Sequence, residues 1–308
     1  MKKIILFVLI YTSLISLCQA QEDDIIYTDY MLFGRREPAS LGSVYSALSN
    51  EPIFFNPAGV AQVTDNRITI GGSVSDLGNS YMLSWTAPNL SISSATHRSD
   101  TKDSTYQEYR KELLKFSFAI SNEDLGFQLN NLFLGCGIAA KWMSDRLFDE
   151  KNKESGGNAL SFDLGLHLTW NYLSFEFTAL NINQPKIGDT DLYYARAFSF
   201  CARYLARSGF MIAVQGINSS TYAGSDFGIN IAAQQGFFSQ RLISRVQLTS
   251  FFKGSEATMQ NISGNVGYRP LMPSNMTFLQ DVEISYTLSF LSMPQTIGTH
   301  LIVLTKYF

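Results

Sequence analysis

The chain has 308 residues, of which 45% are hydrophobic and 16% charged, with 23 Lys and Arg against 26 Asp and Glu. The formal charge of -3 excludes the basic binding stripe that a nucleic-acid partner requires. The high hydrophobic fraction excludes a disordered chain. Because no stretch after residue 20 approaches the roughly 18 apolar residues of a spanning helix, a polytopic helical membrane protein is also excluded.

The first twenty residues have the pattern of a secretory signal peptide. Lys2 and Lys3 precede an apolar run from residue 4 to residue 17, and Ala20 supplies a small residue before the expected cleavage point. We therefore expect residues 1–20 to be removed on export. The alternative is a retained membrane anchor, for which the apolar run is short.

The reactive residues are few and scattered. Without the signal peptide the chain keeps two cysteines, Cys136 and Cys201, and three histidines, His97, His167 and His300. None of them shows metal-ligand spacing or the nucleophile-and-base pairing that covalent catalysis needs. We expect no metal site, no cofactor and no enzymatic activity. Cys136 and Cys201 fall on opposite faces of their strands, so we expect no disulfide.

From residue 67 onward the sequence alternates apolar and polar residues, which predicts an all-β protein. The clearest strand covers residues 160–170, where Leu160, Phe162 and Leu164 alternate with Ser161 and Asp163. The pattern predicts about fourteen strands, at residues 67–75, 79–87, 89–97, 110–120, 125–143, 159–169, 172–182, 193–205, 209–217, 225–236, 241–253, 258–269, 278–290 and 297–308.

The length of these strands favours a transmembrane antiparallel β-barrel over a soluble sandwich. Many run to about ten residues, the length that crosses a bilayer when tilted, whereas sandwich strands average about 5 to 6. The polar face carries titratable residues in mid-strand, which we expect to face a hydrated or ion-paired lumen: Asp163, His167, Glu176, Arg203, Asp226, Arg245 and Glu283. In a soluble sandwich the same residues would simply contact water.

The connections between the strands alternate in length, as outer loops and periplasmic turns do in bacterial barrels. Residues 98–109 and 144–158 are predicted to be long outer loops, and a turn or bulge is expected near Asn130 and Asn131. Aromatic residues at strand ends suit interfacial belts, with cross-strand packing as the alternative: Trp142, Trp170, Tyr172, Tyr193 and Tyr194.

Residues 21–66 differ from the barrel region and are predicted to form a plug segment, with the barrel itself at residues 67–308. Small residues cluster in the first half of this segment, and Asn56 followed by Pro57 is a plausible helix N-cap and first turn. A local turn without further role is the alternative.

The segment also carries a motif that resembles the FadL-like outer-membrane barrels, particularly their PorV and PorQ branch. The motif residues are Gly42, Tyr45, Ala47, Asn56, Pro57, Ala58 and Gly59. The resemblance implies a 14-stranded barrel with the amino-terminal segment folded inside. It also implies that the terminal Phe308 is the aromatic end recognised by the barrel assembly machinery.

Two functions follow from the resemblance. The PorV and PorQ branch implies a docking or cargo-carrying protein of type IX secretion, with secretion components or secreted cargo as partners. This is our first expectation. The alternative is FadL-like passive transport of fatty acids or other hydrophobic solutes. Both place the protein among the lipids of a bacterial outer membrane. An apolar pocket behind residues 41–61 would favour transport, whereas a lumen sealed by ion pairs would favour docking.

Overall fold

A computed structural model describes residues 25–26, 56–75, 78–100, 106–127, 129, 131–149, 154–186, 188, 193–194, 196–206, 208–221, 224–238, 241–253, 256–269, 281–292 and 296–308. The predicted signal peptide and most of the predicted plug lie outside these residues. Within them, no helix is long and apolar enough to span a membrane.

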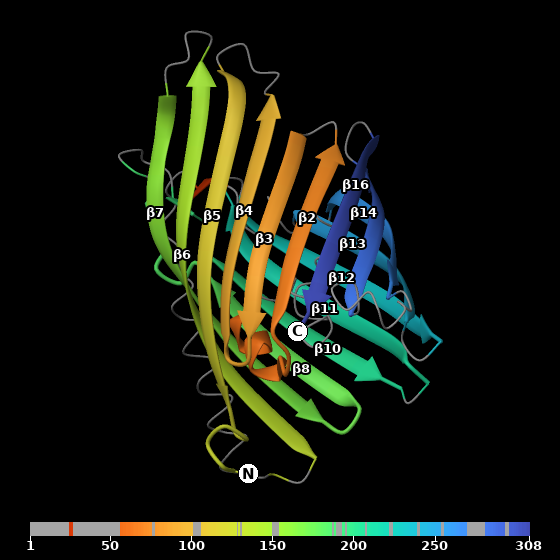
Figure 1. The fold of residues 1–308 in the computed structure, drawn as a ribbon. Helices are drawn as coiled ribbons and strands as arrows, with labels where there is room; N and C mark the ends of the chain where they lie inside the picture. Colours follow the sequence, from red (N-terminus) through yellow and green to blue (C-terminus); the bar gives the residue numbers. More distant parts are fainter. Residues whose placement is uncertain are drawn as a thin grey trace.

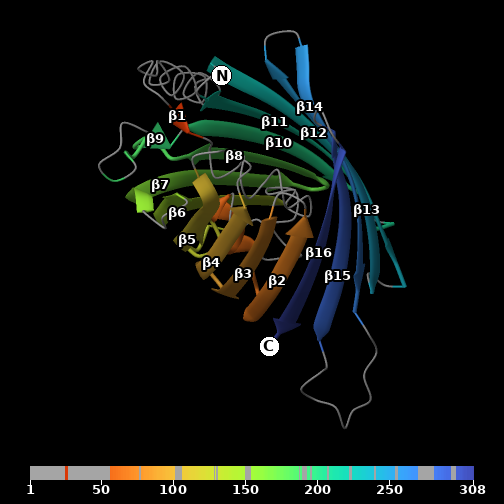
Figure 2. The same cartoon turned by 90° about the horizontal axis from the view of Figure 1, so that it is seen from above.

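Fourteen antiparallel strands form a closed barrel (Figures 1 and 2). The ring is closed by the last strand, which pairs with the first barrel strand from Thr299 opposite Ser75 to Tyr307 opposite Arg67. In chain order the barrel strands are β2 (Arg67–Ser75), β3 (Gly78–Ala87), β4 (Leu90–Asp100), β5 (Tyr106–Ser121), β6 (Leu132–Asp149), β7 (Glu154–Trp170), β8 (Leu173–Leu180), β10 (Ala197–Leu205), β11 (Phe210–Thr221), β12 (Gly224–Phe237), β13 (Leu242–Lys253), β14 (Glu256–Tyr268), β15 (Val282–Ser292) and β16 (Thr296–Tyr307).

Two short elements accompany the barrel. A parallel pair joins β1 (Ile25–Ile26) to β9 (Tyr193–Tyr194). A 3-10 helix, η3 (Pro57–Gln62), lies against the inner face of β4, β5, β6 and β7 near the carboxyl end of the chain (Figure 1). The chain then passes directly from η3 into β2.

The polarity of this barrel is the inverse of that of a soluble protein. Large apolar residues face outward along every strand, as in Ile70, Phe118 and Ile138, whose exposed fractions are 54%, 52% and 57%. Hydroxyl and amide side chains alternate with them and are buried, as in Ser117 and Ser161. Since an apolar outer face is stable only in contact with lipid, this is the fold of an outer-membrane β-barrel.

The all-β barrel predicted from sequence is confirmed, and each of the fourteen predicted strands corresponds to one barrel strand. Tyr193 and Tyr194, which the prediction placed in the strand at 193–205, instead form β9 outside the barrel ring. The strand predicted from residue 125 begins only at Leu132, and the turn expected near Asn130 and Asn131 is present at Asn131. Asn131 has a φ of 56°, a left-handed conformation that ends the turn, and β6 begins one residue later. The predicted loops at 98–109 and 144–158 are also shorter than expected, because β4 to β7 extend into both segments.

Candidate functional site

The site begins at η3, on the inner face of the barrel wall. Asn56 caps η3: its Oδ1 accepts a hydrogen bond from the backbone N–H of Ala58 at 3.0 Å, and Pro57 occupies the first turn. Proline fits there because the first amides of a helix have no partner within the helix. Asn56, Pro57, Ala58, Gly59 and Val60 are all buried.

Two glycines make room for this helix in the wall. Gly137 of β6 and Gly165 of β7 are directly paired across the sheet. A Cβ on Gly165 would lie 2.1 Å from Oδ1 of Asn56, and a Cβ on Gly137 would lie 2.4 Å from the amide nitrogen of Ala58. The glycine pair is therefore a seat that holds the start of η3 against the inner wall.

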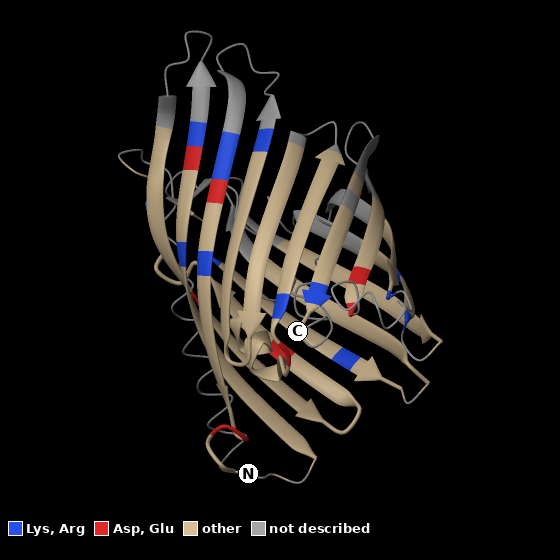
Figure 3. Cartoon of the chain, viewed as in Figure 1, with Lys and Arg blue, Asp and Glu red and all other residues tan. Residues whose placement is uncertain are grey.

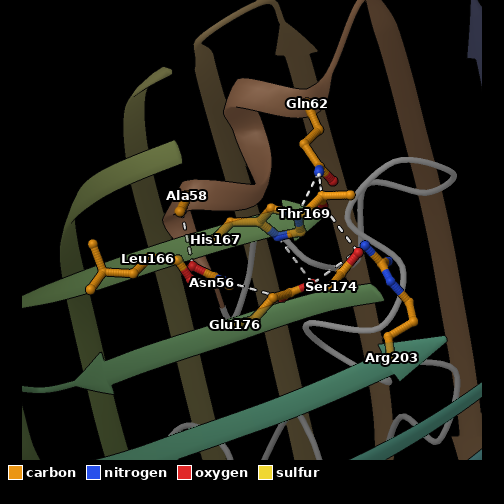
Figure 4. A network of polar contacts seen from close by, with 9 residues as sticks. All are labelled: Asn56, Ala58, Gln62, Leu166, His167, Thr169, Ser174, Glu176 and Arg203. Atoms are coloured by element: carbon orange, nitrogen blue, oxygen red, sulfur yellow. Dashed lines mark hydrogen bonds and ion pairs between the residues drawn. The ribbon is translucent and has the colours of Figure 1, made fainter. Parts of the chain in front are cut away.

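Glu176 of β8 ties the helix to the barrel (Figure 4). The Nδ2 amide of Asn56 donates to Oε2 of Glu176 at 3.1 Å. The other oxygen, Oε1, lies 3.2 Å from Nδ1 of His167 and 3.8 Å from a guanidinium nitrogen of Arg203. Gln62, at the far end of the helix, contacts Nε2 of His167 at 2.5 Å. Both ends of η3 are thus held by one buried polar network.

A second cluster lies further along β7. Lys115 of β5 and Lys141 of β6 are directly opposite each other, and both are buried. Asp163 lies between them, with each ammonium 2.9 Å from a different carboxylate oxygen. Asp163 also accepts the backbone N–H of Asn181 at 3.0 Å. Without this carboxylate, two like charges would face each other in the low dielectric of the lumen.

A third cluster joins the barrel to β9. Lys111 of β5 is directly opposite Asp145 of β6, with 4.0 Å between its ammonium and the carboxylate. The hydroxyl of Tyr194 donates to the same carboxylate, and the Lys111 ammonium lies 4.6 Å from the centre of the Tyr194 ring. Tyr194 is fully buried, so its assignment to an interfacial belt is wrong. Its hydroxyl satisfies a lumen carboxylate instead.

Glu283 lies in a separate group at the barrel seam. Its Oε2 accepts hydrogen bonds from Arg269 at 3.2 Å and from the hydroxyl of Tyr307 at 3.0 Å. The guanidinium groups of Arg269 and Arg67 both stack on the Tyr307 ring, at 4.2 and 5.3 Å from its centre. This group joins β14, β15, β16 and β2, where the ring closes.

The remaining residues singled out in the sequence lie apart from these clusters. Arg245 is buried in β13. Asp226 lies in β12, with its backbone opposite Lys253. Phe308 is exposed at the end of β16 and donates its backbone N–H to the carbonyl of Asn66. Gly42, Tyr45 and Ala47 of the family motif lie outside the described residues.

The sequence analysis missed the two lysines that hold Asp163. Lys115 lies between Leu114 and Phe116, and alternation places these two apolar residues on the outer face. The same alternation predicts that the side chain of Lys115 faces the lumen. The link from Asn56 to Glu176 could not be predicted, because it spans 120 residues and depends on how the ring closes.

Figure 3 shows Lys, Arg, Asp and Glu positions on β4, β5 and β6 and also at the ends of β2 and β16. The charged residues of β5 and β6 include Lys111, Lys115 and Lys141, which are buried. The clusters pair carboxylates with cations across strands and contain no free nucleophile. In the part of the chain that the structure describes, no group of three or more His, Cys, Asp or Glu could hold a metal. Cys136 is exposed on the outer face, Cys201 is buried, and neither forms a disulfide. These buried ion pairs and hydrogen bonds join neighbouring strands on the lumen side, so they are suited to narrowing and shaping the lumen.

Comparison with known proteins supports the fold. No family model matches the chain, and no curated protein does. Among solved structures, the toluene transporter TbuX of Ralstonia pickettii aligns with a TM-score of 0.54 at 10% identity, over 85% of this chain and 94% of that one. The toluene transporter TodX of Pseudomonas putida gives 0.53 at 11% identity, over 93% of this chain and 99% of that one.

A FadL homologue of Pseudomonas aeruginosa gives a TM-score of 0.51 at 9% identity, over 86% of this chain and 95% of that one. These likenesses span nearly the whole length of each solved barrel. The chain therefore has the FadL-like 14-stranded barrel fold.

Proposed function

We propose that the protein is a passive channel for hydrophobic solutes in the outer membrane. The observation that carries this proposal is a barrel of FadL-like fold with a capped inner helix seated against its wall. Two of the solved barrels that share this fold are toluene transporters. A channel of this kind needs neither cofactor nor catalytic residues, which agrees with the chemistry of the lumen clusters.

The helix η3 would act as the inner closure of the channel. Besides the chain connection from η3 to β2, the helix is held at both ends by the network of Asn56, Glu176, His167 and Gln62. Hydrogen bonds between neutral groups contribute about 0.5–1.5 kcal/mol each and those to a charged group about 1.5–3 kcal/mol, so displacement of the helix requires new partners for the buried Glu176.

Uptake in intact cells tests the proposal. The protein is expressed in a bacterium that lacks its own barrel for hydrophobic solutes, and radiolabelled toluene and a long-chain fatty acid are supplied at low concentration. We expect uptake of at least one probe to exceed that of cells carrying an unrelated barrel. Equal uptake of both probes in the two strains would contradict the proposal.

A second candidate is a docking role of the PorV or PorQ type in type IX secretion. The observation that favours it is the set of buried ion pairs that join β5, β6 and β7 on the lumen side of the wall: Lys115–Asp163–Lys141 and Lys111–Asp145. Mass spectrometry of the protein extracted from its own membrane in mild detergent separates the two candidates. Secretion components or cargo at near-stoichiometric amounts would support docking, and bound hydrophobic solute without protein partners would support transport.

A further inference from the structure

The group at the barrel seam contains two guanidinium groups but one carboxylate. Oε2 of Glu283 accepts hydrogen bonds from Arg269 at 3.2 Å and from the hydroxyl of Tyr307 at 3.0 Å. Arg67 lies where β2 begins beside the end of β16 (Figure 1), and its guanidinium lies 5.3 Å from the centre of the Tyr307 ring. The carboxylate is therefore engaged by Arg269 and Tyr307, and Arg67 has no carboxylate of its own in this group.

Arg67 is a buried cation without a counter-charge. Its exposed fraction is 2%, and its Nε and Nη1 atoms have no hydrogen-bond partner in the part of the chain that the structure describes. The nearest carboxylate in sequence, Asp65, is exposed and accepts a hydrogen bond from Thr64. A guanidinium stays protonated in proteins, so burial cannot neutralise it. Because a buried charge is stable only when it is paired, this position requires an anion.

The inner wall beside Arg67 presents hydroxyl groups that also lack partners. Thr86 of β3 is directly opposite Arg67, and Ser91 of β4 is directly opposite Thr86. Both side chains are fully buried, and neither hydroxyl oxygen has a hydrogen-bond partner among the described residues. The same holds for Ser84 and Ser93, which face each other two residues along the same strands. Buried polar groups are almost always hydrogen-bonded, so these oxygens indicate a bound polar species.

Arg67, Thr86 and Ser91 form one row on the lumen side of the wall. Their neighbours in sequence, such as Ile68 and Trp85, point outward and are exposed. Adjacent strands lie about 4.8 Å apart, so the three residues fall within about 10 Å along the row. An ion bound between β2 and β4 can therefore contact the guanidinium and the hydroxyls together.

The chemistry of these groups fits a tetrahedral oxyanion. Nε and Nη1 of Arg67 can only donate hydrogen bonds, and the hydroxyls of Thr86 and Ser91 can rotate to donate. A phosphate group offers at least three strong acceptor oxygens that point in different directions, whereas a carboxylate offers two oxygens in one plane. Donors that come from three neighbouring strands therefore suit phosphate better than carboxylate.

We propose that the inner wall of β2, β3 and β4 binds a phosphate-type oxyanion, held by Arg67 and by the hydroxyls of Thr86 and Ser91. The ion supplies the counter-charge of Arg67 and links the first three strands of the barrel beside the point where the ring closes. The same contacts hold free phosphate and the phosphate group of a larger solute. The site lies apart from the network that holds η3 and does not depend on the proposed function.

Equilibrium dialysis of the purified protein in detergent against radiolabelled inorganic phosphate tests the site. We expect a single saturable site in the wild type. Arg67→Met keeps the length of the side chain and removes its charge, and should weaken binding about a hundredfold or more. Thr86→Val should weaken it about tenfold.

Arg245→Met is the matched control, because Arg245 is also buried on the inner wall but lies on β13, four strands away from β2. This variant should bind phosphate like the wild type. No binding by the wild type, or equal binding by Arg67→Met and the wild type, would overturn the site.

Competing ions identify the ligand. A sugar phosphate, acetate and chloride are each added against the labelled phosphate at matched ionic strength. Displacement by the sugar phosphate would support a site for the phosphate group of a larger solute, and failure to displace would support a site for the free ion. Acetate or chloride that displaces phosphate at equal concentration would overturn the assignment to a phosphate-type oxyanion.

Thermal unfolding separates anion binding from a purely structural role of Arg67. Without phosphate, Arg67→Met lacks an unpaired buried charge and should unfold at or above the wild-type temperature. Saturating phosphate should raise the unfolding temperature of the wild type by about 5 °C or more, because it binds only the folded state, and should leave Arg67→Met unchanged. Equal shifts in the two proteins would contradict the proposal.

Discussion

Single residues decide how the inner helix meets the wall. Gly137 and Gly165 face each other where the backbone of η3 approaches the sheet, and neither has a positive φ. Their role is therefore to leave space rather than to allow an unusual backbone. The cap at Asn56 depends on that space, because its side chain reaches Glu176 only from this position.

A methyl group in the seat should displace the helix. In Gly165→Ala the new Cβ would overlap Oδ1 of Asn56, and overpacking of this kind costs about 1–3 kcal/mol. We expect faster protease cleavage near residues 56–62 and a lower unfolding temperature in detergent. Gly264→Ala is the control, because a Cβ there meets nothing within 4 Å. Equal behaviour of the two variants would show that η3 is not seated on Gly165.

The buried carboxylate of Asp163 should be indispensable to its cluster. Asp163→Asn leaves Lys115 and Lys141 facing each other without a counter-charge, and breaking a buried ion pair in this way costs about 3–5 kcal/mol. Urea unfolding in detergent measures the loss. Asp163→Leu combined with Lys115→Met and Lys141→Met removes all three charges and should recover most of it. A single variant as stable as the wild type would contradict the assignment.

At the scale of elements, the turn between β5 and β6 is organised by polar side chains. Asp124 accepts hydrogen bonds from the backbone N–H and the hydroxyl of Ser121, each at 2.7 Å. Asn122 accepts the N–H of Leu134 at 2.7 Å and donates to the carbonyl of Phe127 at 2.8 Å. These bonds hold the turn while Leu125 and Phe127 project from it, exposed by 57% and 63%.

This turn should respond to acid. The hydrogen bond from Ser121 holds the pKa of Asp124 below its ordinary value, with a further contribution from Asn89. A carboxyl whose pKa is lower in the folded state stabilises the fold above its unfolded pKa of about 3.9 and loses that contribution as the pH falls through the folded pKa. We expect Asp124→Asn to reduce the loss of stability between pH 5 and pH 2, measured by thermal unfolding. Asp65→Asn, in another exposed turn, is the control, and an unchanged pH profile in Asp124→Asn would refute the link.

The elements that sequence predicted well are those governed by alternation alone. The strand from Leu160 to Trp170 was evident because its two faces differ so sharply in polarity. Tyr194 was misplaced because its surroundings depend on β5 and β6, which lie far away in the chain. The ion-pair partners of Asp163 could be identified only once the strand register was known. The alternation of residues along β7 was enough to predict that Asp163 faces the lumen. The strand predicted at 172–182 ends at Leu180, because Asn181 takes a left-handed φ of 52°, which the alternation of residues does not indicate.

At the scale of the whole molecule, the inverted polarity fixes where lipid must lie. Cys136 faces outward between Leu134 and Ile138, while Cys201 is buried on the inner side. The reactivity of the two thiols therefore shows what contacts each side of the barrel wall, and no cysteine has to be introduced to measure it.

Thiol labelling in membranes should distinguish the two faces. We expect Cys136 to react with a small maleimide that partitions into lipid and to resist a charged, membrane-impermeant maleimide. Cys201 should react with neither reagent until the protein is unfolded. Mass spectrometry of the labelled peptides measures both. Rapid labelling of Cys136 by the charged reagent would mean that this face of the barrel contacts water.

The closure of the ring between β16 and β2 also sets an order of assembly. The helix η3 immediately precedes β2, yet its seat and its Glu176 partner belong to β6, β7 and β8, which are synthesised more than seventy residues later. The contacts between η3 and the wall therefore cannot form until β6, β7 and β8 are present. Once β16 has paired with β2, the barrel wall surrounds η3. The closure of the ring thus keeps this helix inside the barrel.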